Sequence, residues 1–237
     1  SEIDLPAETD YHAAEVYAKA HDNLQAMIAA GTLIRDPEPA VYLYRQVREG
    51  VAQLGLVCCV ETEQYRSGEI RKHEKTRPDK EDDRTRHLLV TACHAEPVFL
   101  CFRDLAGGPL AARMAADAAG PPAFDFTAPD GVQHTGWTVP DAGPYVAAFK
   151  QLDLLYIADG HHRSAGAERA AAASQAHSPA HTGREEYGRF LAVVFPHDQL
   201  RILPYNRVVV DLNGHSPAGL LAALADGALL VLEQADG

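Results

Sequence analysis

The chain has 237 residues, of which 46% are hydrophobic and 23% are charged, and its formal net charge is −12. This composition is that of a folded globular protein, and the negative charge disfavours a nonspecific nucleic-acid binder, which needs a basic surface. No apolar run approaches the ~20 residues that span a bilayer, and no basic-then-apolar secretory signal opens the chain, so we expect a protein outside the membrane.

The N-terminal region predicts one helix followed by a hairpin. Good capping residues at Thr9 and Asp10 and a stop at Gly31 bound an amphipathic helix. Its buried face is expected to carry Val16, Leu24, Met27 and Ile28. Two strands, Ala40–Val47 and Val51–Val60, are expected to pair across a turn at Arg48-Glu49-Gly50.

The most polar part of the chain, Glu61 to Arg86, follows the hairpin. Charges of both signs after Pro78 favour a helix that begins there and runs toward Cys93. Leu88, Leu89 and Ala92 are expected on its inner side.

Strands and helices then mix without strict alternation. Further strands are expected at Pro97–Phe102, Val132–Val139, Leu154–Ala158, Tyr187–Phe195, Arg207–Val210 and Ala228–Leu232. Further helices are expected at Pro109–Ala119, Asp141–Lys150, Ser164–Ala173 and Ser216–Ala225. This order predicts a single α+β domain over residues 1–237, with a mixed sheet and helices packed on it.

Four cysteines are present: Cys58, Cys59, Cys93 and Cys101. Cys58 and Cys59 are adjacent on a predicted strand and face opposite ways, so no metal knuckle is indicated. We interpret all four as small buried hydrophobic residues in a reducing compartment, the cytoplasm, and we identify no metal ligands.

The region around Asp159-Gly160-His161-His162-Arg163 joins a predicted central strand to an alanine-rich helix. Gly160 permits backbone angles that a side chain forbids, so we expect a tight turn and a helix that starts within a residue or two of His161. Free N–H groups and the positive dipole end of a helix favour anions, so the basic cluster suggests a phosphate site. The alternative is that Asp159 caps an ordinary helix whose first turn is solvated.

Two stretches resemble one family, the bacterial and archaeal domain-of-unknown-function 1015 family. They are His73-Glu74-Lys75-Thr76, with the charged tract Lys80 to Arg84 after it, and Ile157 to Arg163. The order of the two motifs agrees with the family, and the resemblance covers nearly all of the chain. It implies that the sequence is a fragment of a longer protein, with further segments at both ends.

The turn is also similar to that of the ParB and sulfiredoxin superfamily, which implies a core of that kind around the strand, turn and helix. Members of that superfamily include a nucleotide-dependent kinase of free serine, so the analogy implies nucleotide phosphates as ligands. The two motif stretches must then meet in a shared cleft.

Phosphoryl transfer needs positive groups around the phosphate and a base at the attacking hydroxyl. We therefore expect Gly160, His161, His162, Arg163, Lys75 and His73 to bind phosphate or nucleotide. Glu74 is the candidate base or metal ligand, His161 or His162 can also shuttle a proton, with His162 the candidate catalytic residue, and Asp159 orients a histidine. The expected cofactor is ATP or ADP with Mg²⁺, and the second substrate is a small hydroxyl metabolite.

Two other functions remain open. A nucleotide-sensing or partner-binding module would use the same turn without turnover. A metal-dependent phosphoester hydrolase would require clustered Asp, Glu or His ligands. The histidine and lysine tract at His73 to Thr76 also has a plain alternative, a solvated loop whose charges pair across the surface. The sequence leaves the oligomeric state open.

Overall fold

The structure is a computed structural model that describes residues 4–103, 108–204, 206 and 208–225. The chain divides into two units, residues 1–200 and 201–237. In the described part the helices are α1 (Ala14–Ala29), α2 (Thr62–Ser67), α3 (Pro78–Thr91), α4 (Pro109–Asp117), α5 (Gly143–Phe149), α6 (His161–Ala176) and α7 (Pro217–Ala225). The strands are β1 (Val41–Arg48), β2 (Val51–Glu61), β3 (Ile70–Arg71), β4 (Val98–Phe102), β5 (Phe124–Thr127), β6 (Gln133–Val139), β7 (Leu155–Asp159) and β8 (Arg189–Pro196).

The first unit is built on one mixed sheet of the order β3-β7-β4-β8-β2-β1-β6-β5. The pairs β3–β7 and β4–β8 are parallel, and the other neighbours are antiparallel. The α+β class with a mixed sheet is therefore confirmed. A ParB and sulfiredoxin-like core stays a prediction.

The hairpin between β1 and β2 is confirmed. Glu49 and Gly50 both have positive φ, 51° and 76°, so the two-residue turn twists in the sense that suits a tight hairpin. The strands then pair from Arg48↔Val51 to Tyr42↔Val57.

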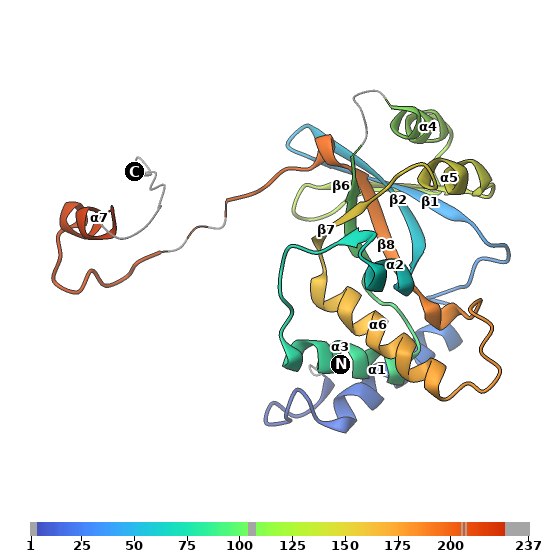
Figure 1. The fold of residues 1–237 in the computed structure, drawn as a ribbon, viewed down its shortest axis with the longest axis horizontal. Coiled ribbons are helices and arrows are strands. Elements are labelled where there is room, and N and C mark those ends of the chain that lie inside the picture. The colour runs from blue at the N-terminus through green and yellow to red at the C-terminus, as the bar shows by residue number, and fades with distance from the viewer. Residues whose placement is uncertain (1–3, 104–107, 205, 207, 226–237) are drawn as a thin grey trace. The chain divides into compact units, whose positions relative to one another are not determined.

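Helices cover the sheet in two groups (Figure 1). α6, α3 and α1 lie in succession on one side of the strands, while α4 and α5 lie together at the other end. The buried core joins strand residues such as Leu56, Leu100 and Val194 to helix residues such as Met114 and Tyr145. Burial of this apolar surface holds the motif-bearing helix α6 against the sheet, because four of its alanines are buried as well.

The strand before the motif turn, β7, is not central. It is the second strand from an edge, covered there only by the two residues of β3. The sequence predicted a central strand because its run of apolar residues is typical of a buried one. β3 in turn contacts α2, which also packs against α6.

The first helix is shorter and less buried than predicted. It begins at Ala14 and not at the predicted caps, and the Asp10 carboxylate instead accepts the N–H of His12. Val16 is buried, but Leu24 is only half-buried and Met27 and Ile28 are exposed. The reason is that α1 is held to α3 near its first turn, where the Tyr17 hydroxyl donates to Asp83.

The polar stretch holds more structure than predicted. α2 and β3 both form inside it, and the edge strand β5 was also missed. α3 begins at Pro78 as predicted but ends at Thr91, because Ala92 takes a left-handed conformation with φ 50°. Leu88 packs against the core, whereas Leu89 and Ala92 are exposed.

The structure also corrects the predictions for the cysteines and for the strand near residue 208. Cys59 is exposed, because it lies on the outer face of β2, while the other three cysteines are half-buried. Residues 208–210 form no strand, since no strand in the described part of the chain pairs with them and their valines are exposed; Arg207 and Ala228–Leu232 lie outside the described residues. α7 forms close to the predicted range in the second unit.

Candidate functional site

The site is organised by the turn between β7 and α6. β7 ends at Asp159, Gly160 has φ 98°, and α6 begins at His161, as the sequence predicts. The Ser164 N–H bonds back to the Gly160 carbonyl. Within the described residues, nothing accepts the N–H groups of His161, His162 and Arg163, and Gly160 offers no capping side chain. These three groups therefore remain available to an anion.

The His73–Thr76 segment lies directly over His161. The His73 N–H donates to His161 Nε2 across 3.4 Å, and the two rings meet edge to face with centroids 4.3 Å apart. The other ring nitrogen, Nδ1, lies 3.6 Å from the Glu74 carboxylate. His161 is only 4% exposed, whereas the Glu74 side chain is 56% exposed. The structure therefore brings the two motifs together, although more than 80 residues separate them.

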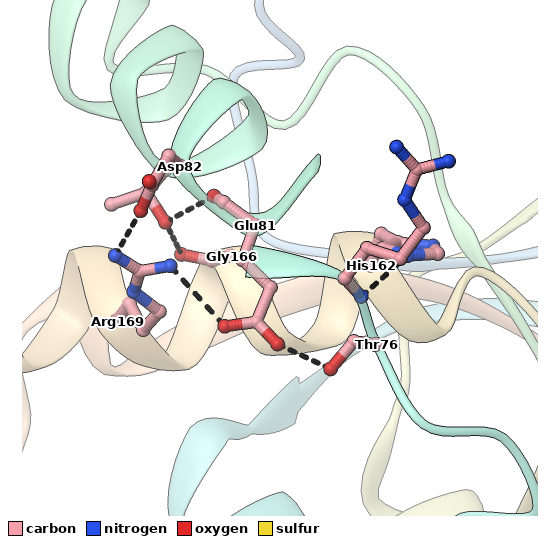
Figure 2. Close-up of polar contacts among 8 residues, drawn as sticks. Thr76, Glu81, Asp82, His162, Gly166 and Arg169 are labelled. Carbon is pink, nitrogen blue, oxygen red and sulfur yellow. Dashed lines mark hydrogen bonds and ion pairs between the residues drawn. The ribbon is translucent and has the colours of Figure 1, made fainter. Parts of the chain in front are cut away.

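His162 holds the far end of the same segment. The Arg77 N–H donates to its Nε2 across 3.2 Å, and Figure 2 shows His162 beside the chain just after Thr76. Since Nε2 accepts a backbone proton in both histidines, the proton of each neutral ring belongs on Nδ1. Burial lowers the pKa of His161, and the nearby His73 lowers it further, against an opposing effect of Glu74. The neutral ring is therefore favoured.

Arg163 points away from this segment. Its Nη1 donates to the Pro97 carbonyl at 2.6 Å and lies 3.6 Å from Glu96, while its Nη2 donates to Asp159 at 2.5 Å. Asp159 thus binds the arginine and not a histidine. The guanidinium fastens the turn to the loop before β4, and any phosphate contact requires it to exchange these partners.

The remaining predicted residue, Lys75, is exposed, and no side chain in the described part of the chain pairs with it. Its ammonium group is therefore accessible to a ligand. Thr76, next in sequence, is the half-buried member of the segment.

A polar network that sequence reasoning missed anchors the segment to two helices (Figure 2). The Thr76 hydroxyl donates to Glu81 on α3, and Arg169 on α6 donates to Glu81 and to the neighbouring Asp82. The sequence did mark Lys80 to Arg84 as a salt-bridged helix start. Arg169, the partner of this charged tract, could be found only by noticing that it follows His162 by seven residues. That spacing is two helical turns, so both residues lie on the same face of the helix.

The main cavities do not coincide with the meeting point of the motifs. Arg163 lines one of about 130 Å³, together with Arg84, His87, His94 and Glu96. Two larger cavities, of about 400 and 650 Å³, are lined by neither motif. A ligand at the start of α6 would therefore bind on an open surface formed by the exposed segment.

The described part of the chain has neither a cluster of metal ligands nor a membrane-spanning helix. It contains no group of three or more His, Cys, Asp and Glu side chains that could hold a metal ion. None of its helices is long and apolar enough to cross a membrane.

Comparison with known proteins gives one match. A family model described as a protein of unknown function, DUF1015, matches residues 1–234. No curated protein and no solved structure matches the chain. The match spans nearly the whole sequence, as the resemblance in the sequence predicts, and the chain belongs to the DUF1015 family.

Proposed function

We propose that the chain binds the phosphates of a nucleotide, ATP or ADP, at the start of α6 and transfers a phosphoryl group to the hydroxyl of a small metabolite. The observation that carries the proposal is the packing of His73 and Glu74 against His161, the first residue of α6. This packing puts a carboxylate beside a buried imidazole, and that imidazole belongs to the residue with which α6 begins. A base and an anion site therefore lie together.

In the proposed reaction the hydroxyl oxygen of the metabolite bonds to the terminal phosphorus, and the bond from that phosphorus to the nucleotide oxygen breaks. Glu74 accepts the hydroxyl proton, and its exposure leaves it within reach of a substrate. The first N–H groups of α6 and the exposed Lys75 stabilise the negative charge on the phosphate, and the Nδ1–H of His162 adds a donor.

Mg²⁺ fits this site as an ion carried on the nucleotide. Such an ion needs only one or two protein carboxylates besides the phosphate oxygens, and Glu74 is the candidate where it acts as a ligand instead of as the base. When bound, it would neutralise charge on the phosphate oxygens. A hydrolase that holds its own metal has less support, because no ligand cluster lies among the described residues.

One observation favours the non-catalytic alternative. Both histidines already use Nε2 to hold backbone N–H groups, and Arg163 is bonded to Asp159 and Pro97. In the ligand-free protein these groups therefore form bonds within the protein itself. A module that senses a nucleotide, by rearranging these bonds, would need the same turn and no base.

The test combines binding with turnover. Titration calorimetry with ATP, ADP and phosphate, with and without Mg²⁺, measures binding, and labelled nucleotide with a pool of hydroxyl metabolites detects a new phosphorylated product. Glu74→Gln is expected to keep binding and to slow transfer by about 10²–10⁴-fold, the usual contribution of a positioned base.

Glu63→Gln is the matched control, since Glu63 is 59% exposed but is paired with Arg66 and not with either motif. Binding without product in the wild type would select the sensing module. If no nucleotide or phosphate binds at all, both forms of the proposal fail.

A further inference from the structure

The His73–Thr76 segment has few contacts that hold it in place. Residues 72–77 form no regular structure, and all but Thr76 are exposed. Its two ends are held by backbone N–H bonds of 3.4 and 3.2 Å to His161 and His162. Bonds of that length to neutral rings are modest, so a third anchor between them has a large share in fixing the segment.

Thr76 is that third anchor. Its hydroxyl donates to Glu81, whose side chain is only 22% exposed, and the same carboxylate accepts from Arg169 Nη1 at 3.2 Å. Arg169 also donates to Asp82. The carboxylate of Glu81 therefore ties the segment to α3 and α6 at once, while Asp82 touches the arginine but not the segment (Figure 2).

The close approach of the two helices puts Glu81 in reach of both partners. A Cβ on Gly166 would lie 2.8 Å from Arg84 Cβ and 3.2 Å from the Thr85 nitrogen, so α6 needs a glycine here to touch α3. The Thr85 hydroxyl donates to the Glu81 carbonyl at 2.7 Å and lies 3.5 Å from the Gly166 carbonyl. The helix pair is a fixed frame, and Glu81 transmits its position to the segment.

We propose that Glu81 is a positioning residue, which through Thr76 fixes where the Glu74 carboxylate lies against His161; this inference rests on the proposed function. Thr76 follows Glu74 by two residues, so a chain reach of only about 7 Å separates the anchor from the proposed base. Arg169 holds the Glu81 carboxylate in the orientation that receives the hydroxyl. Substrate touches neither of them.

The test measures the tautomer and the pKa of His161. Nitrogen-15 NMR of the ligand-free protein is expected to show His161 with its proton on Nδ1. Thr76→Val and Glu81→Ala are expected to shift that signal toward the Nε2–H form and to move the pKa of His161 up toward its ordinary value of 6.5, because the loss of burial and of His73, which both lower this pKa, outweighs the loss of Glu74, which raises it. Transfer activity is expected to fall about tenfold or more, since the base loses its placement.

Two controls separate positioning from general damage. Thr76→Ser keeps the hydroxyl and is expected to restore the wild-type spectrum. Asp82→Ala removes the other acidic partner of Arg169 and is expected to leave His161 unchanged. If Thr76→Val leaves the His161 signal and pKa as in wild type, or if Asp82→Ala changes them as much as Glu81→Ala does, the inference is wrong.

The outcome is distinguishable from that of the proposed function. The NMR measurement needs no ligand, so an absence of nucleotide binding would reject the proposed function and leave the positioning result readable. Conversely, nucleotide transfer that is unaffected by both Thr76→Val and Glu81→Ala rejects the positioning role alone. Should Glu81→Ala fail to fold, Thr76→Val decides, because it leaves the pairing of α3 with α6 untouched.

Discussion

The two sides of the first turn of α6 use neighbouring residues for different purposes. On one side His161 and His162 accept backbone N–H groups from the His73–Thr76 segment. On the other side Arg163 donates to Asp159 and to the Pro97 carbonyl. Successive residues of a helix point about 100° apart, so a basic cluster in the sequence need not be one cluster in space.

The difference assigns distinct parts to residues that the sequence grouped together. The histidine side is where the two motifs meet and where a carboxylate lies beside a buried ring. On the arginine side, Arg163 fastens the turn to the loop before β4, the strand that lies next to β7 in the sheet. We therefore expect substitutions on the arginine side to act mainly through stability, and those on the histidine side to act mainly through the segment.

Arg163→Ala has the largest expected effect. It removes the charge-assisted bonds of a side chain that is 24% exposed, including the one to the Pro97 carbonyl, so unfolding by urea should become easier by about 1.5–3 kcal/mol. Arg35→Ala is the control, because the Arg35–Glu186 pair is 88% exposed on both sides and should contribute almost nothing. Equal stability of the two variants would show that Arg163 is free to serve a ligand.

Gly160→Ala tests the turn from which the two sides diverge. Its φ of 98° is strained for alanine, and the new Cβ would lie 3.0 Å from Arg163 Nε, so a loss of about 1–2 kcal/mol is expected. Gly131→Ala provides the comparison, since Gly131 has φ 83° with nothing near its missing Cβ. The excess loss in Gly160→Ala measures the contact with Arg163. No excess would mean that the guanidinium moves aside freely.

The sequence predicted the turn well because its signals are local. Gly160 follows an apolar run and precedes an alanine-rich one, and the helix starts at His161 as expected. The hairpin at Glu49 and Gly50 was predicted for the same reason. Glycines that require positive φ, and short runs of strand formers, determine their own conformation.

The parts that were missed depend on distant partners. Met27 and Ile28 look buried by periodicity, but within the described residues both are exposed near the end of α1. The bonds of Arg163 to the Pro97 carbonyl and of Arg169 to Glu81 depend on how α6 is rotated against its neighbours. One sequence gives the faces of a helix, and it does not say which face meets which element.

The smallest expected effect is a dependence of stability on pH from the histidine side. Burial and His73 hold the pKa of His161 below 6.5 in the folded chain, against Glu74 and Asp159, which raise it, while His162 lowers it. The unfolded chain has the ordinary value, so this contribution is fully present above pH 6.5 and is lost as the pH falls below it. A protonated ring has no lone pair for the His73 N–H, so protonation of His161 releases the segment.

Because His87 and His94 also have lowered pKa values from burial, the contribution of His161 must be measured as a difference between variants. His161→Gln can still accept the His73 N–H through its amide oxygen but cannot titrate, so its unfolding free energy from about pH 8 to about pH 5 should fall less steeply than that of wild type. Parallel curves for the two proteins, or an NMR titration of His161 at or above its ordinary pKa, would show that the ring does not hold the segment in its neutral form.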